Sequence, residues 1–93
     1  MRILGYLEHP SLKITVFKND NRLSLKLENE GYEQTFKLRE DGLIESLDDV
    51  KRLADDAFLA QIQSNFQAMH RARLAAMSRA FPADDGDVFE EII

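Results

Sequence analysis

Histidine and paired carboxylates are the side chains here that could do acid–base or metal chemistry, and their spacing argues against both. The two histidines, His9 and His70, stand far apart in the sequence, and no acidic residue lies three or four positions from His70. A zinc site needs three or four ligands in a recognisable spacing. The sequence therefore predicts structural roles for both histidines and no metal site.

The acidic pairs at 48–49, 55–56 and 90–91 are adjacent in sequence. Neighbouring side chains on a helix point about 100° apart, so such pairs do not share a proton. The acidic run 84–87 lacks the spacing of a calcium loop. No serine has a Gly-x-Ser-x-Gly context, no glycine-rich phosphate loop is present, and the chain has no cysteine. These observations predict neither an enzyme nor a cofactor.

Composition indicates one small globular domain. The chain has 93 residues, of which 44% are hydrophobic and 31% are charged. It shows neither the apolar run of a signal peptide nor the ~20 apolar residues that span a bilayer, so we expect a cytoplasmic protein without membrane contact. The net charge of −5 disfavours nucleic acid as a partner, although residues 1–39 carry seven basic and five acidic side chains.

Alternation of apolar and polar residues predicts strands at 12–17, 22–28 and 32–39, with an earlier strand at 3–8. In that first strand we expect Ile3, Gly5 and Leu7 on one face and Leu4 and Tyr6 on the other. Turn residues at 9–11, 19–21 and 29–31 leave only short connections. Short connections force antiparallel neighbours, so the pattern predicts a four-stranded β-meander.

Parity limits the pairing of the second and third strands, because their apolar residues must share a face. One register places Val16 opposite Leu25 and Lys13 opposite Glu28, whereas the alternative places Lys13 opposite Lys26. Like charges directly opposite are unfavourable, so we expect the first register.

Helical spacing replaces alternation after residue 42. Ser46 and Asp49 are typical of a capping box, and Asp55 and Asp56 suit the start of a second helix. The pattern leaves open whether 46–81 forms one helix or two. We expect a single α+β domain at 1–82, with the meander at 1–39, one short and one long helix at 46–81, and an acidic tail at 83–93.

A helix over 57–81 would be about 37 Å long, against about 20–27 Å for the strands. Its far end would overhang the sheet, and a second copy is the simplest source of cover. The expected dimer interface comprises Phe66, His70, Leu74, Met77 and Phe81.

The polar face of the sheet offers a different function. It would interleave basic and aromatic side chains, a pattern suited to single-stranded nucleic acid: Tyr6, Lys13, Phe17, Arg22, Lys26, Lys37 and Arg39. Glutamates on the same face favour cross-strand ion pairs instead, and the aromatic residues suit a protein interface equally well.

The order of four strands followed by helix, over residues 3–81, resembles the topology of the PUR-alpha and Whirly single-strand-binding domains. That resemblance implies dimerisation through helices and nucleic-acid binding on a curved sheet. No motif matches residue by residue, so no site is carried over. The sequence favours a non-enzymatic interaction or regulatory module acting as a homodimer with an unidentified protein partner, and single-stranded nucleic-acid binding is the alternative.

Overall fold

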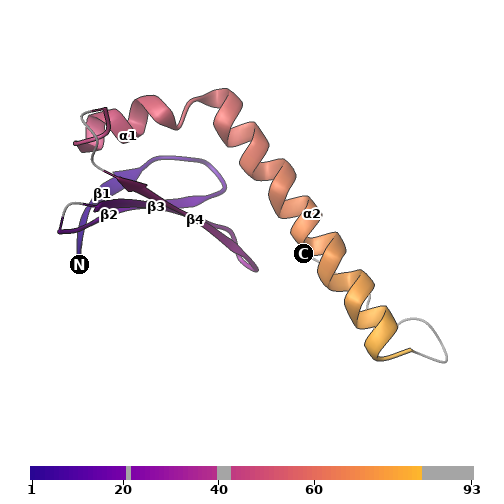
Figure 1. Cartoon of the computed structure of the whole chain (residues 1–93). Helices are drawn as coiled ribbons and strands as arrows, with labels where there is room; N and C mark the ends of the chain where they lie inside the picture. Colours follow the sequence, from indigo (N-terminus) through magenta and orange to yellow (C-terminus); the bar gives the residue numbers. More distant parts are fainter. Residues whose placement is uncertain (21, 40–42, 83–93) are drawn as a thin grey trace.

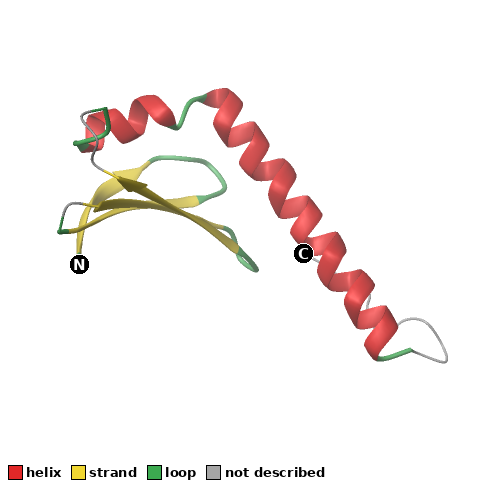
Figure 2. Cartoon of the chain, viewed as in Figure 1, coloured by secondary structure: helices red, strands yellow, loops and turns green. Residues whose placement is uncertain are grey.

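The chain folds as an α+β domain, seen here in a computed structural model that describes residues 1–20, 22–39 and 43–82. Within these residues a four-stranded antiparallel sheet of order β1-β2-β3-β4 is followed by a short and a long helix (Figures 1 and 2). The elements are β1 (Arg2–Leu7), β2 (Lys13–Asn19), β3 (Arg22–Glu28), β4 (Glu33–Arg39), α1 (Leu47–Leu53) and α2 (Asp56–Ala80). The predicted β-meander and both helices are confirmed.

The core lies between one face of the sheet and the two helices. On β3 every second side chain is buried, and Ile14, Val16 and Leu25 of the two central strands are at most 1% exposed. Val50 of α1 and Ile62 and Phe66 of α2 complete the cluster from the other side. Burial of each such side chain contributes about 1.5–3 kcal/mol, so this seam holds the helices on the sheet.

The turns use the residues that the sequence provides for them. Asp20 adopts a left-handed φ of 57° between β2 and β3, a conformation that aspartate tolerates. In the next turn, Oδ1 of Asn29 accepts hydrogen bonds from the N–H groups of Gly31 and Tyr32, at 2.9 and 2.8 Å. These side-chain contacts fix the short connections that make the strands antiparallel.

The predicted register of β2 and β3 is confirmed, with Val16 opposite Leu25 and Lys13 opposite Glu28. The prediction for β1 is wrong at its start. A β-bulge between Ile3 and Gly5 places Ile3 opposite Phe17, on the face away from the helices, and Ile3 is 51% exposed. The bulge adds a residue to one strand only, so alternation does not run unbroken through it. Leu4 instead packs against the core, beside Gly5 and Leu7.

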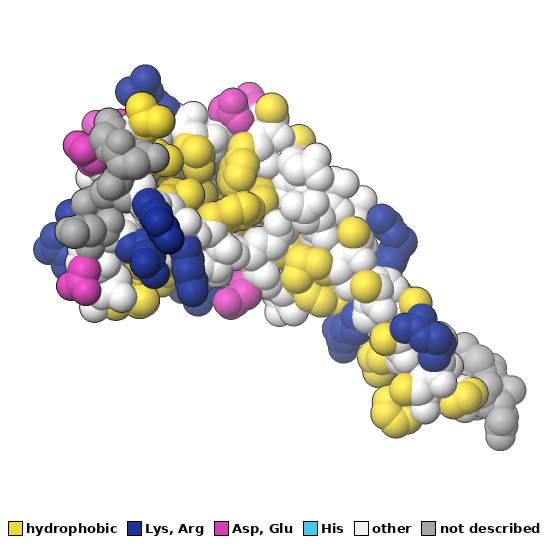
Figure 3. Space-filling model, viewed as in Figure 1, with side chains coloured by type: hydrophobic (Ala, Val, Ile, Leu, Met, Phe, Trp, Pro, Cys, Tyr) yellow, Lys and Arg dark blue, Asp and Glu magenta, His cyan; other side chains and the backbone are white. Residues whose placement is uncertain are grey.

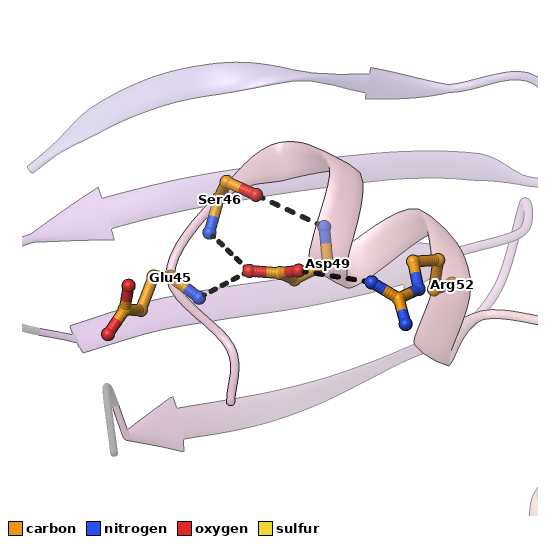
Figure 4. Close-up of polar contacts among 4 residues, drawn as sticks. All are labelled: Glu45, Ser46, Asp49 and Arg52. Atoms are coloured by element: carbon orange, nitrogen blue, oxygen red, sulfur yellow. Dashed lines mark hydrogen bonds and ion pairs between the residues drawn. The ribbon is translucent and has the colours of Figure 1, made fainter. Parts of the chain in front are cut away.

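The helical region consists of two helices, which settles what the sequence left open. Ser46 caps α1 through a capping box: its Oγ accepts from the N–H of Asp49, whose carboxylate accepts in return from the N–H of Ser46 (Figure 4). The first helix ends with Ala54 as its C-cap. Asp55 then caps α2 by accepting a hydrogen bond from the N–H of Phe58 at 2.9 Å. The acidic tail expected at 83–93 lies outside the described residues.

The long helix overhangs the sheet, as its length predicts. α2 has 25 residues, about 38 Å, and its last buried residue is Phe66. Figure 1 shows its far end projecting away from the strands, and the radius of gyration is 16.8 Å, against about 12 Å for a compact chain of this length. Neither helix in the described part of the chain is apolar enough over a sufficient length to cross a bilayer.

Candidate interaction surfaces

The end of α2 is the first candidate surface, and we call residues 70–81 the α2 overhang. Leu74 and Met77 are half-exposed, and Phe81, which caps the helix, is 65% exposed. Their spacing of three and four residues places them on one side of the helix. Figure 3 shows hydrophobic side chains at this end of the molecule, beside basic ones. They form an apolar stripe that the chain's own sheet does not cover.

Two residues of the expected dimer interface belong instead to the chain's own fold. Phe66 is 4% exposed and lies in the core. His70 is half-buried, and its Nδ1 shares a hydrogen bond of 3.0 Å with the hydroxyl of Tyr32. The remaining stripe is therefore shorter than expected and consists of Leu74, Met77 and Phe81.

A groove of about 350 Å³ lies where α2 leaves the sheet. Its walls come from the turn between β3 and β4 and from one side of α2: Asn29, Tyr32, Gln63, Phe66, Gln67, His70 and Arg71. The rings of Tyr32 and His70 meet edge to face, with centroids 6.0 Å apart. Gln63, Gln67 and His70 precede Leu74 at intervals of four and three residues, so the groove continues the apolar stripe along the same side of the helix.

Gln34 is a contact residue that the sequence does not reveal. It lies on the apolar side of β4, where its Nε2 donates to the carbonyl oxygen of Ile62 at 3.0 Å and its Oε1 accepts from Nδ2 of Asn65 at 3.1 Å. These bonds tie β4 to the middle of α2. They help to fix the direction in which the overhang leaves the sheet.

The outer sheet face is the second candidate surface, and it is divided by charge. Glu28 and Glu33 stand directly opposite each other on β3 and β4, and Nζ of Lys26 lies 3.8 Å from a carboxylate oxygen of each. The same Nζ lies 5.9 Å from the centre of the Phe17 ring, a cation–π distance. Lys26, one of the predicted binding residues, therefore contacts both the ring of Phe17 and the acidic pair.

The other end of the outer face gathers three basic side chains. Arg22 stands opposite Arg39. Lys37 stands opposite Ser24, which is the next pair along the strands whose side chains share this face. Among the described residues the structure records no carboxylate within ion-pair distance of these three side chains. The juxtaposition follows from the β3–β4 register, in which Leu23 stands opposite Leu38.

The remaining outer-face residues lie along β1 and β2. Tyr6 is 55% exposed and stands opposite Thr15, which is only 3% exposed, and Lys13 is exposed opposite Glu28. Register places all seven predicted residues on one face. Tyr6 lies level with Lys26 through Thr15, and Lys13 lies level with Glu28, so both are further along the strands than the pair of Arg22 and Arg39.

Each histidine has a structural partner. Nδ1 of His9 accepts hydrogen bonds from the N–H groups of Ser11 and Leu12, at 3.1 and 3.2 Å, and so shapes the connection from β1 to β2. That connection borders a hollow of about 610 Å³ that includes Glu8 and Lys13. In the described part of the chain, no three His, Cys, Asp or Glu side chains gather as a metal site would require.

Comparisons with other proteins add nothing to this geometry. No protein-family model, curated protein or solved structure matches the chain. The order of elements shared with the single-strand-binding domains therefore stands as a likeness of topology alone, and any functional argument has to come from the two surfaces described above.

Proposed function

We propose that this protein is a non-enzymatic interaction module that acts as a homodimer through the α2 overhang, with the sheet as a rigid platform. The observation that carries the proposal is the length of α2 beyond Phe66, its last buried residue. The apolar stripe of half-buried Leu74 and Met77 and exposed Phe81 lies on that segment. The absence of cysteine suits a reducing compartment such as the cytoplasm.

Energetics favour a partner for the overhang. Covering a side chain such as Phe81 contributes about 1.5–3 kcal/mol. A second copy supplies the same apolar stripe and needs no other molecule, which makes self-association the simplest arrangement.

Sedimentation velocity at micromolar concentration tests the proposal. The wild type should sediment as a dimer, and Leu74→Asp with Met77→Asp should sediment as a monomer with an unchanged circular dichroism spectrum of the sheet. The matched control is Ala72→Asp with Ala75→Asp, which adds the same charge to the opposite, exposed side of the helix. That control should remain dimeric. A monomeric wild type would contradict the proposal.

A specific observation also favours the alternative, binding of single-stranded nucleic acid. Among the residues that the structure describes, Arg22, Lys37 and Arg39 gather at one end of the outer sheet face with no carboxylate within ion-pair distance, and Tyr6 is exposed elsewhere on the face. Cations that track phosphates and aromatic rings that stack on bases are the features such surfaces use.

Fluorescence polarisation with a labelled oligonucleotide tests this alternative. Binding should weaken with rising salt and with Arg22→Glu or Arg39→Glu. Lys26→Glu serves as the comparison, because Lys26 already contacts two carboxylates and should matter less. If the protein retains no oligonucleotide even at low salt, the alternative is excluded.

A further inference from the structure

We infer that the acidic tail, residues 83–93, turns back along α2 of its own chain and covers the stripe of Leu74, Met77 and Phe81. The tail therefore competes with a second copy for this surface. Docking within the chain stands without the homodimer, and only its effect on dimerisation rests on the proposed function. Three observations carry the inference: the charges beside the stripe, the composition of the tail and its length.

Arginines border the stripe on both sides. With 3.6 residues per turn, Arg71 and Arg73 lie to either side of the line through Leu74 and Met77. Both arginines are exposed, and residues 57–82 contain no Asp or Glu. In the described part of the chain, no carboxylate lies within ion-pair distance of either guanidinium. The stripe is therefore an apolar surface with a positive border, and Figure 3 shows basic side chains beside hydrophobic ones at this end of the molecule.

The composition of the tail is complementary to this surface. The tail contains five acidic residues and no basic one: Asp84, Asp85, Asp87, Glu90 and Glu91. It also contains four large apolar residues: Val88, Phe89, Ile92 and Ile93. The tail thus brings apolar side chains to the stripe and negative charge to its border. Opposite charges attract, and charges at a partly covered surface are screened less than those in open solvent.

The tail is long enough to reach back over the stripe. α2 ends before Pro82, and residues 83–86 are rich in the Asp and Gly that favour turns. Residues 87–93 span about 10 Å at helical rise and about 23 Å when extended. The stripe runs for about 10 Å along α2 from Phe81 back to Leu74. Either conformation therefore covers the stripe.

The charges favour the tail over a second copy as the first occupant of the stripe. The overhang of a second copy carries the same arginines, so two uncovered overhangs repel each other. The tail carries the opposite charge and is tethered to the helix that it covers, at an effective concentration on the order of millimolar. A second copy has to displace it, so the tail sets the protein concentration at which dimers form.

Förster transfer in the intact chain tests the docking. Ser64 is exposed on α2 and the chain has no cysteine, so Ser64→Cys with Ile93→Cys can carry a donor and an acceptor. A tail turned back over the stripe places residue 93 about 5–18 Å from residue 64 along the helix axis. A tail that continues beyond Pro82 places it more than about 27 Å away. We expect the strong transfer of the first arrangement.

Dilution separates docking within one chain from docking on a second copy. The measurement is made at nanomolar concentration, where the proposed micromolar dimer dissociates. Strong transfer that persists on dilution supports the inference. Weak transfer at every concentration would overturn it. Transfer that appears only as the concentration rises to micromolar would place the tail on the second copy and would overturn it as well.

Charge exchange identifies the surface that the tail covers. Arg71→Glu with Arg73→Glu should weaken the transfer, and so should Glu90→Arg with Glu91→Arg. The four changes together again oppose unlike charges and should restore the transfer, which a merely structural effect of the single pairs would not do. Arg79→Glu is the control, because Arg79 is exposed on the side of α2 opposite the stripe. Transfer that the combined variant fails to restore would overturn the assignment of the tail to this surface.

Sedimentation distinguishes a failure of this inference from a failure of the proposed function. Val88→Ser with Phe89→Ser should release the tail and lower the Kd of the dimer about tenfold, as expected if each wild-type stripe is free for about a third of the time. An unchanged Kd together with weak transfer would end the docking and leave the homodimer intact. Strong transfer in a wild type that stays monomeric, as does this variant, would end the homodimer and leave the docking intact.

Discussion

The hydroxyl of Tyr32 lies 3.0 Å from Nδ1 of His70 and joins the turn between β3 and β4 to α2 where the helix leaves the sheet. Nη1 of Arg73 donates to the same hydroxyl at 3.5 Å. A guanidinium can only donate, so the hydroxyl accepts from Arg73, and its own proton can go to Nδ1 of His70 in the tautomer in which that nitrogen carries no proton. The overhang therefore begins at a hydrogen-bonded contact, which limits how far it can swing relative to the sheet.

Tyr32→Phe tests this contact, because it keeps the ring and removes the hydroxyl. We expect the free energy of unfolding to fall by about 1 kcal/mol, which is the usual net contribution of such a hydrogen bond to stability. Urea denaturation followed by circular dichroism would measure it. Tyr6→Phe is the matched control, since the chain's other tyrosine is 55% exposed and should change little. Equal losses for the two variants would argue against a stabilising Tyr32–His70 bond.

The capping box of α1 predicts a dependence of stability on pH. The N–H of Glu45 donates to Asp49 at 2.9 Å and, with the hydroxyl and N–H of Ser46, holds the pKa of Asp49 below its usual value of 3.8 (Figure 4). A carboxylate with a lowered pKa in the folded state stabilises the fold above its unfolded pKa. That contribution is lost as the pH falls from about 4 through the lower, folded pKa.

Asp49→Asn removes this titration. Below about pH 4 the wild type should lose stability more steeply than the variant, whereas Asp48→Asn should follow the wild type because the capping box is formed by Ser46 and Asp49. Thermal unfolding across the pH range would measure the difference. Parallel curves for wild type and Asp49→Asn would contradict the assignment.

At neutral pH, Ser46→Ala should lower the free energy of unfolding by about 1 kcal/mol, because the variant loses the N-cap of α1.

The sequence predicted those parts of the fold that one local rule decides. Alternation set the faces of the central strands, and the charge on Lys13 selected their register because the competing pairing opposed Lys26. The β1 bulge left no such mark: Ile3 and Leu4 are both apolar, so either one suits the core face. The pattern of apolar residues favours neither of the two for the core face. The contact of Leu4 with the core decides which side chain points inward.

The candidate sites were predicted less completely. The apolar end of α2 follows from helix length, which is a local property, whereas its boundary depends on how Phe66 and His70 use the chain's own sheet. The groove and the opposition of Arg22 to Arg39 arise from residues brought together by the hairpin and the helix crossing. Parity does not predict the arginine pair, because it allows several registers of β3 and β4, and like-charge repulsion disfavours the observed one, in which Arg22 opposes Arg39 and Glu28 opposes Glu33.

The position of Lys26 predicts a salt-dependent loss of stability. Glu28 and Glu33 face each other across β3 and β4, and Lys26 lies 3.8 Å from both. Lys26→Ala leaves two like charges opposed, which should cost about 0.5–1 kcal/mol at low ionic strength and less at high salt. Lys37→Ala is the control, because Lys37 neighbours Arg39 on the same face and its removal relieves positive charge. Equal effects of the two variants would refute this role for Lys26.

The Gln34 bridge predicts how firmly α2 is held. Gln34→Ala removes the bonds to the carbonyl of Ile62 and to Asn65 and leaves the half-buried amide of Asn65 short of a partner. We expect the free energy of unfolding to fall by about 1–2 kcal/mol. Gln67→Ala is the control, since Gln67 is exposed on the same helix and its replacement should hardly change the free energy of unfolding.

Amide hydrogen exchange would show where the Gln34→Ala variant is destabilised. Protection should fall in α2 around Ile62 before it falls in β2 and β3, because the bridge joins the helix to the edge strand β4 and not to the centre of the sheet. Uniform loss of protection throughout the domain would show that Gln34 supports the whole core and does not act as a local tie.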